Sequence, residues 1–182
     1  MKIVLLGYMA SGKTINASKL SEILQISHID LDTFIEEKEN LSVPEIFSKK
    51  GEIYFRKIET IYLEELLLSD NDFVLSVGGG TPCYANNIDL IKKHAISFYL
   101  KATAAVLYTH LSIEKEKRPL VSIFKNDELE EFIAKHLFER NQFYLKADHY
   151  IEVNMLKKTV AEVCAEIVDI INLSSINNSF TV

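Results

Sequence analysis

The 182-residue sequence contains no tryptophan and only two cysteines, Cys83 and Cys164, which lie far apart without a C-x-x-C pattern. That spacing indicates neither a zinc site nor a disulfide framework, so both thiols are expected to be reduced. Basic residues are also not in excess, because 20 Lys and Arg stand against 26 Asp and Glu, for a net charge of −6. Binding to nucleic acids or to an anionic membrane surface depends on excess basic charge, and the sequence therefore argues against both partners.

No apolar run approaches the roughly 18 residues that a transmembrane helix needs. The apolar stretch 3–6 could begin a signal peptide, but Gly7 interrupts it and Gly12-Lys13-Thr14 follows where a cleavage site would lie. A buried first strand explains these residues better, and we expect a cytoplasmic protein. At 48% hydrophobic and 25% charged residues, the composition is that of an ordinary globular chain, and the length predicts one domain.

Short β-rich runs alternate with helical patterns, which is typical of a parallel sheet covered by helices on both faces. Strands are predicted at Lys2–Leu6, Ser27–Asp30, Asp72–Val77, Ala95–Leu100 and His149–Val153. Helices are predicted at Lys13–Leu24, from Pro44 to about Gly51, and at Glu52–Leu68, Asp127–Leu145 and Leu156–Ile171. The aperiodic stretch Ser112–Lys125 is predicted to be a surface loop, and the end of the chain from Ser174 a frayed polar tail.

The most specific motif is Gly7-Tyr8-Met9-Ala10-Ser11-Gly12-Lys13-Thr14, a full match to G-x-x-x-x-G-K-[ST]. It lies between an apolar strand and an amphipathic helix, which is the context of a phosphate-binding P-loop. Glycines let the backbone wrap around a phosphate, and the helix N-terminus supplies positive potential. Lys13 can then reach the β- and γ-phosphates of a nucleoside triphosphate, and the Thr14 hydroxyl can bind Mg²⁺. The alternative is a chance glycine-rich turn, which the strand–loop–helix context argues against.

Residues for a phosphoryl acceptor follow later strands. Asp30 and Asp32 stand at the end of the second strand, where ligands of open α/β sheets bind. One carboxylate suits the water shell of a metal and the other a substrate hydroxyl, although Asp32 could instead cap a helix that begins near Thr33. The triplet Gly78-Gly79-Gly80 follows the third strand without a Walker B aspartate. It allows a small ligand to approach the backbone closely, or it is simply a tight turn.

Three arginines are candidate anion ligands. Arg56 lies three residues before Glu59 on one face of a predicted helix, so the carboxylate can orient the guanidinium. Arg140 lies on a later helix and Arg118 in the basic stretch 112–125, and their guanidinium groups suit bidentate binding of carboxylate or phosphate. The alternatives are an exposed Arg56–Glu59 surface pair and solvated side chains for the other two.

The chain resembles shikimate kinase over roughly residues 1–171. The resemblance rests on six motifs in this order: G-Y-M-A-S-G-K-T, D-L-D, G-E-x-x-F-R-x-x-E, G-G-G-T-P, K-R-P-L and E-R-x-x-x-Y. The resemblance implies an α/β fold, a three-layer α/β/α P-loop kinase with a five-stranded parallel sheet. A single domain at 1–173 would hold a lid at about 112–125 and a shikimate-binding region at about 32–60. The implied enzyme is a monomer that transfers the γ-phosphoryl group of ATP to the 3-hydroxyl of shikimate with Mg²⁺, on the route to chorismate and the aromatic amino acids.

The resemblance also implies roles for particular residues. The implied nucleotide-binding residues are Gly7, Ala10, Ser11, Gly12, Lys13, Thr14, Ile15, His110, Arg118 and Asn154. The implied shikimate-binding residues are Asp32, Phe47, Phe55, Arg56, Gly78, Gly79, Gly80 and Arg140. Thr14 and, through water, Asp30 would hold Mg²⁺. Lys13, Asp32 and Arg118 would be catalytic, with Asp32 orienting the attacking hydroxyl and Arg118 closing over the phosphates from the lid.

Two positions depart from the family pattern. Ile15 stands where a second hydroxyl residue usually touches the α-phosphate, and His110 where an arginine often packs against adenine, so both bear on nucleotide affinity. Val153 and Asn154 are expected to form the adenine loop. The rival interpretations are a gluconate or nucleotide kinase and a non-catalytic nucleotide-binding regulator. The paired arginines with D-x-D suit a small hydroxylated carboxylate better than a nucleotide acceptor, and a regulator would show no acceptor-dependent turnover.

Overall fold

The computed structural model describes residues 1–113, 126–154 and 157–179. Its centre is a five-stranded parallel sheet with the strand order β2-β3-β1-β4-β5. The strands are β1 (Lys2–Leu6), β2 (Ser27–Asp30), β3 (Phe73–Ser76), β4 (Ile96–Lys101) and β5 (His149–Glu152). The prediction of a five-stranded parallel sheet is confirmed, and the predicted strand ends differ from these by at most one residue, which is ordinary for strand and helix boundaries.

The three central strands form the core of the sheet. Residues 3–6 of β1 and 73–76 of β3 are buried, as are residues 97–100 of β4. Because helices cover both faces of a parallel sheet, its central strands are continuous apolar runs rather than alternating ones. The edge strands β2 and β5 are less buried, in agreement with their more polar sequences.

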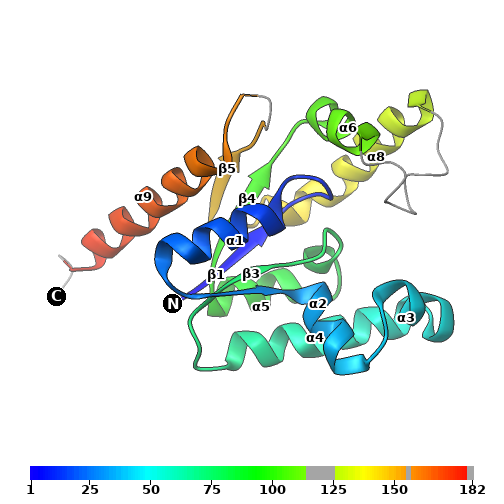
Figure 1. The fold of residues 1–182 in the computed structure, drawn as a ribbon, viewed down its shortest axis with the longest axis horizontal. Helices are drawn as coiled ribbons and strands as arrows, with labels where there is room; N and C mark the ends of the chain where they lie inside the picture. The colour runs from blue at the N-terminus through cyan, green and yellow to red at the C-terminus, as the bar shows by residue number, and fades with distance from the viewer. Residues whose placement is uncertain (114–125, 155–156, 180–182) are drawn as a thin grey trace.

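Helices lie on both sides of the sheet (Figure 1). They are α1 (Lys13–Leu24), α2 (Leu31–Glu39), α3 (Val43–Lys50), α4 (Glu52–Leu68), α5 (Asn87–His94), α6 (Ala104–Ile113), α8 (Asn126–Tyr144) and α9 (Val160–Ser179), with a 3₁₀ turn, η1 (Thr81–Cys83). Helix α1 contacts β1, β2, β3 and α9, whereas α5 contacts β4 and α4. Figure 1 shows α1 and α9 on one side of the sheet and α4 and α5 on the other, which gives the three-layer α/β/α arrangement.

Helices α2, α5 and α6 differ from the sequence prediction. Helix α2 begins at Leu31 rather than near Thr33, and α5 and α6 are not predicted at all. Helix α5 is amphipathic but has only eight residues, too few for its period to stand out in the sequence, and α6 is apolar around most of its circumference. The predicted loop 112–125 begins inside the last turn of α6, and its residues 114–125 lie outside the described part of the chain.

Helix α9 is displaced toward the C-terminus relative to the prediction. It starts after Thr159, whose Oγ1 accepts from the Glu162 N–H while Glu162 Oε2 accepts from the Thr159 N–H, a capping box. Neither glycine nor proline follows Ile171, and the helix continues to Ser179. The structure therefore has helix at 174–179, where the sequence predicts a frayed tail. Over the described ranges, neither α9 nor any other helix is long and apolar enough to cross a membrane.

Candidate active site

The P-loop connects β1 to α1, and its carbonyl groups accept hydrogen bonds from within the loop. Gly7 has φ 149°, and a Cβ there would lie 2.7 Å from Ser11 Oγ and 2.9 Å from the Leu100 carbonyl oxygen, so the position requires glycine. Lys13 Nζ folds back over the loop and donates to the carbonyls of Gly7 and Tyr8, both at 2.9 Å. Ser11 Oγ is buried without a hydrogen-bond partner among the described residues. A buried hydroxyl beside a helix N-terminus suits a phosphate oxygen.

The other predicted nucleotide-binding residues do not all lie beside the P-loop. Ala10, in the left-handed region at φ 61°, has its carbonyl oxygen 3.2 Å from Nδ1 of His110 on α6, and Ile15 is 52% exposed on α1. Asn154 lines a groove of about 700 Å³ with residues 101–103 at the end of β4, whereas His110 is not among the described residues that line it. The structure thus joins His110 to the P-loop but not to Asn154. Arg118 lies outside the described ranges.

Asp30 links the P-loop to β2, β3 and α2. Its Oδ1 accepts from the N–H groups of Asp32 at 3.1 Å and Thr33 at 3.5 Å, so Asp30, and not Asp32, caps α2. Its Oδ2 accepts from Thr14 Oγ1 at 3.1 Å and Ser76 Oγ at 2.7 Å. Together, the Thr14 hydroxyl and the Asp30 carboxylate are hard oxygen donors, which fit Mg²⁺. The described residues hold no cluster of three or more His, Cys, Asp or Glu side chains arranged for a metal ion.

The Asp32 side chain lies at the glycine turn. Its Oδ1 is 3.5 Å from the position that a Cβ on Gly78 would occupy. The pKa of Asp32 is raised from 3.8 to about 6, mainly by burial and also by the nearby Asp30 and Glu59 carboxylates, while Lys13 acts in the opposite direction. A carboxylate whose pKa lies this close to neutrality is a better proton acceptor than an ordinary aspartate while still being ionised at pH 7.

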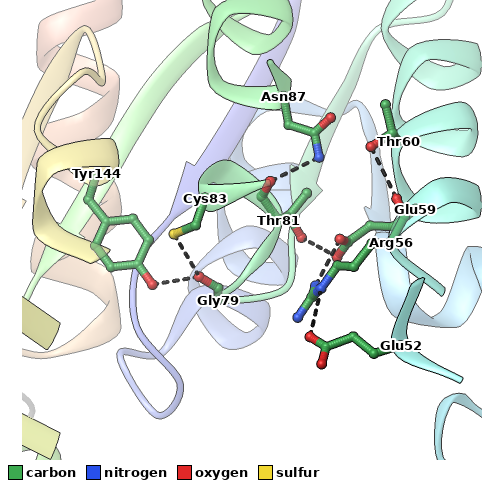
Figure 2. A network of polar contacts seen from close by, with 9 residues as sticks. All are labelled: Glu52, Arg56, Glu59, Thr60, Gly79, Thr81, Cys83, Asn87 and Tyr144. Carbon is green, nitrogen blue, oxygen red and sulfur yellow. Dashed lines mark hydrogen bonds and ion pairs between the residues drawn. The ribbon is translucent and has the colours of Figure 1, made fainter. Parts of the chain in front are cut away.

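Arg56 belongs to a buried network, shown in Figure 2. Its Nη1 donates to Glu59 Oε2 at 2.9 Å, and the other Glu59 oxygen accepts from Thr81 Oγ1 at 2.6 Å. The side chains of Arg56 and Glu59 are only 17% and 1% exposed, so the alternative of an exposed surface pair is wrong. Asn87 Nδ2 in turn donates to the Thr81 carbonyl at 2.9 Å. The network fixes the guanidinium from behind and ties α4 to the turn after β3.

Gly78–Gly80 form a tight turn, and other groups of the site lie close to its backbone. A Cβ on Gly79 would lie 3.3 Å from Arg140 Nη1 and 3.4 Å from the backbone nitrogen of Met9 in the P-loop. One on Gly80 would lie 2.7 Å from Arg56 Nη2. The turn therefore has one arginine against each of its last two residues and the P-loop beside it. Two arginines from different helices, converging on one turn, can clamp a carboxylate bidentately.

Arg140 and the two phenylalanines complete the predicted acceptor set. Arg140 is half-buried on α8, with Cζ 5.9 Å from the centroid of the Tyr8 ring, so it is not merely solvated. The Phe47 and Phe55 rings lie 4.6 Å apart, and Arg56 Cζ lies 5.3 Å from the Phe55 ring. Phe55 is buried and Phe47 is 36% exposed. The pair thus forms an apolar surface beside Arg56.

Several polar residues of the site are not predicted from the sequence. Ser76 and Thr81 hold Asp30 and Glu59, and Tyr144 donates to the Gly79 carbonyl. On the P-loop side, Tyr8 OH lies 3.0 Å from His136 Nδ1 of α8. Only the position of Thr81 directly after the glycine triplet, and of Tyr144 one turn after Arg140, offered a signal. Their partners are distant in sequence and could not be identified from it.

The comparisons with known proteins agree with this geometry. The shikimate kinase family model matches residues 9–172. The chain belongs to the shikimate kinase family. Its relatives include the shikimate kinase of Flavobacterium johnsoniae, 48% identical over 171 residues that cover 93% of this chain and 98% of that one. That of Flavobacterium psychrophilum is 47% identical and covers 84% of this chain and 90% of the relative.

Solved shikimate kinases share the fold over nearly the whole chain. The structure from Bacteroides thetaiotaomicron has a TM-score of 0.88 at 31% identity, covering 94% of this chain and 98% of that one. The structure from Acinetobacter baumannii, a complex with shikimate, has a TM-score of 0.84 at 30% identity, covering 95% and 93%. A gluconokinase from Sinorhizobium meliloti matches with a TM-score of 0.57 at only 14% identity, so its likeness concerns the fold alone.

Proposed function

We propose that this protein is a shikimate kinase that transfers the γ-phosphoryl group of ATP to the 3-hydroxyl of shikimate and yields shikimate 3-phosphate. The observation that carries the proposal is the placement of Asp32, Arg56 and Arg140 around a glycine turn that directly adjoins the P-loop. A phosphate cradle beside a pair of arginines and a buried carboxylate suits an acceptor that carries both a carboxylate and a hydroxyl group. Family membership and the shikimate complex of the relative from Acinetobacter baumannii support the same acceptor.

On the acceptor side, Arg56 and Arg140 bind the carboxylate of shikimate, and Phe47 and Phe55 border the ring. Backbone at Gly78–Gly80 approaches the ring from the sheet. Asp32 binds the attacking hydroxyl and accepts its proton, a role favoured by the pKa of about 6. The reaction depends mainly on this positioning, because phosphoryl transfer requires little covalent chemistry from the protein.

On the nucleotide side, the P-loop backbone, the Ser11 hydroxyl and Lys13 bind the phosphates. Thr14, with Asp30 through water, would hold Mg²⁺, which neutralises phosphate charge when bound. The roles of Ile15, His110 and Asn154 toward the nucleotide stay predictions. So does that of Arg118 as the lid arginine, since this residue lies outside the described ranges.

A coupled assay of ADP release over a panel of hydroxylated acids tests the proposal. ADP release is expected to require ATP, Mg²⁺ and shikimate together, and ³¹P NMR should show a phosphate monoester on the 3-hydroxyl. Gluconate is the comparison that separates this activity from that of a gluconate kinase. Equal turnover with gluconate, or ATP binding without any shikimate-dependent turnover, would refute the assignment.

The organisation of the chain is also a proposal. A single kinase domain at 1–173, with an acceptor region at about 32–60, agrees with the continuous sheet and with the family match over 9–172. The monomeric state and the cytoplasmic location stay predictions of the sequence.

A further inference from the structure

Three consecutive glycines have no side chains with which to pack, so the turn at 78–80 needs hydrogen bonds from its surroundings to keep one conformation. Two of its carbonyls are satisfied locally. Gly78 accepts from the Thr81 N–H at 3.1 Å, and Gly80 from the Cys83 N–H at 2.9 Å. The Gly79 carbonyl instead accepts from the hydroxyl of Tyr144, on α8, at 2.6 Å. A side chain 65 residues away in sequence thus sets the plane of the Gly79–Gly80 peptide group.

Tyr144 is itself held firmly. Its side chain is fully buried, and its ring packs against that of Tyr99 with centroids 5.1 Å apart. Burial raises the pKa of the Tyr144 phenol, and the hydroxyl therefore stays protonated and donates at neutral pH. The Cys83 thiol, 3.9 Å from the same carbonyl, is a longer and weaker donor. Tyr144 is therefore the main determinant of where the Gly79 carbonyl points.

We infer that Tyr144 is a positioning residue for the acceptor, because it turns the Gly80 N–H toward the acceptor pocket. In a trans peptide group the carbonyl and the following N–H point in opposite directions. Anchoring the Gly79 carbonyl on α8 therefore directs the Gly80 N–H away from α8. Figure 2 shows Tyr144 on one side of the turn and Arg56 with Glu59 on the other. There the N–H donates to an oxygen of the acceptor that Arg56 holds.

The inference rests on the proposed function, since it concerns the acceptor of that same site. Tyr99 offers a matched control for its test. Like Tyr144, it is buried, and its hydroxyl donates to a partner on α8, Asn141 Oδ1, at 3.1 Å. Its hydrogen bond, however, does not involve the glycine turn. Replacing either tyrosine by phenylalanine removes one buried hydroxyl and keeps the ring.

Calorimetric titration of Tyr144→Phe and Tyr99→Phe with shikimate and, separately, with ADP is the first experiment. Tyr144→Phe is expected to weaken shikimate binding about tenfold, with a matching rise in the KM for shikimate. Its affinity for ADP should match that of the unsubstituted protein. Tyr99→Phe should lower the melting temperature to a similar extent and leave shikimate affinity unchanged. Equal loss of shikimate affinity in both variants would overturn the inference, because Tyr144 would then act only through stability.

Glycine amide resonances of the unsubstituted protein and the same two variants give a second test. The chain has six glycines, and only Gly79 and Gly80 follow another glycine, so combined ¹⁵N and carbonyl-¹³C glycine labelling identifies their amides. Saturating shikimate should shift the Gly80 amide strongly in the unsubstituted protein and in Tyr99→Phe, but much less in Tyr144→Phe. If shikimate binds and the Gly80 amide does not move, the inference fails while the proposed function stands. If shikimate does not bind at all, the proposed function fails instead.

Discussion

At the scale of single residues, Asp32 combines two properties that conflict. The proposed reaction needs an ionised, partly desolvated carboxylate, and the same desolvation destabilises the fold. Its pKa is raised from 3.8 to about 6, so the folded protein holds this proton more tightly than the unfolded chain does. Ionised Asp32 therefore lowers the free energy of unfolding above about pH 6, and this cost disappears below pH 3.8, where both states are protonated.

Asp32→Asn is accordingly expected to raise the free energy of unfolding by about 1–3 kcal/mol at pH 7. It should also lower kcat at least about 100-fold, because the proton acceptor is lost. Urea denaturation at pH 7 and near pH 4, with steady-state kinetics, measures both effects. The stability gain should shrink at the lower pH. An Asn variant that is less stable than the unsubstituted protein at pH 7 would contradict this account of Asp32.

The two arginines are expected to respond differently to truncation. Arg140→Ala should weaken shikimate binding about 10- to 100-fold and leave ADP affinity unchanged, because a charge-assisted bidentate contact contributes about 1.5–3 kcal/mol. Arg56→Ala should weaken shikimate binding as well, but it also leaves Glu59, 1% exposed, without its cation. An uncompensated buried charge costs about 3–5 kcal/mol of stability.

Calorimetry and thermal unfolding of the two variants separate these effects. In Arg56→Ala, the additional change Glu59→Gln should restore most of the lost melting temperature without restoring shikimate affinity. Unchanged shikimate affinity in both single variants would place the carboxylate clamp elsewhere.

At the scale of elements, the P-loop depends on the absence of a side chain at its first residue. Gly7→Ala places a Cβ 2.9 Å from the Leu100 carbonyl oxygen, which belongs to β4 and cannot move without distorting the sheet. We expect a loss of at least about tenfold in ADP affinity and about 2–3 kcal/mol in stability. Gly51→Ala is the matched control, because Gly51 also has positive φ but a Cβ there meets nothing within 4 Å. If the two variants bind ADP equally well, contact with Leu100 does not shape the P-loop.

The three helices next to the acceptor site meet at one carboxylate. Glu39 of α2 accepts from Tyr54 and Tyr62 of α4, both at 2.8 Å, and from Lys50 of α3 at 2.9 Å. These hydrogen bonds, led by that of Lys50, lower the pKa of Glu39 from 4.5 to about 2. The stabilisation is therefore fully present above pH 4.5 and is lost as the pH falls from 4.5 toward 2.

Glu39→Gln should lower the free energy of unfolding by about 1–2 kcal/mol at pH 7, because charge-assisted hydrogen bonds are replaced by neutral ones. The difference from the unsubstituted protein should diminish near pH 3 in urea denaturation. Glu65→Gln serves as the control, since the Lys38–Glu65 pair is about half exposed and is expected to contribute less than about 1 kcal/mol. Equal effects of the two substitutions would show that Glu39 does not join the helices.

At the scale of the whole molecule, the described residues of the proposed site all come from one chain. The order β2-β3-β1-β4-β5 places the ends of β1 and β3 side by side, and the P-loop thereby adjoins the glycine turn. Arg56 and Arg140 reach that turn from α4 and α8 without a second subunit.

The net charge of −6 also opposes self-association of the protein. Sedimentation equilibrium is expected to give a mass of 20.8 kDa, that of one chain, at every concentration tested. A stable dimer would show that the site is assembled in a larger particle than expected.

Elements with local signals are predicted correctly from the sequence. The strands around β1, β3 and β4 are predicted from their apolar runs, and α1 and α4 agree with the prediction at both ends. The P-loop motif, too, is local, because eight consecutive residues contain the glycines, the lysine and the threonine that define it. The resemblance to the shikimate kinase family then indicated the residues of the proposed acceptor site. It did not indicate which hydrogen bonds and ion pairs fix their side chains.

The contacts and burial of those residues, in contrast, depend on the tertiary structure. Asp30, rather than Asp32, caps α2, and the Arg56–Glu59 pair is buried rather than exposed because Thr81 closes over Glu59. The contact of Tyr144 with Gly79 joins residues 65 apart. Such contacts depend on strand order and helix packing, whereas periodicity reports only which face of an element is apolar. A sequence pattern therefore identifies a chemical group, and the packing of distant segments determines its burial, its pKa and its partner.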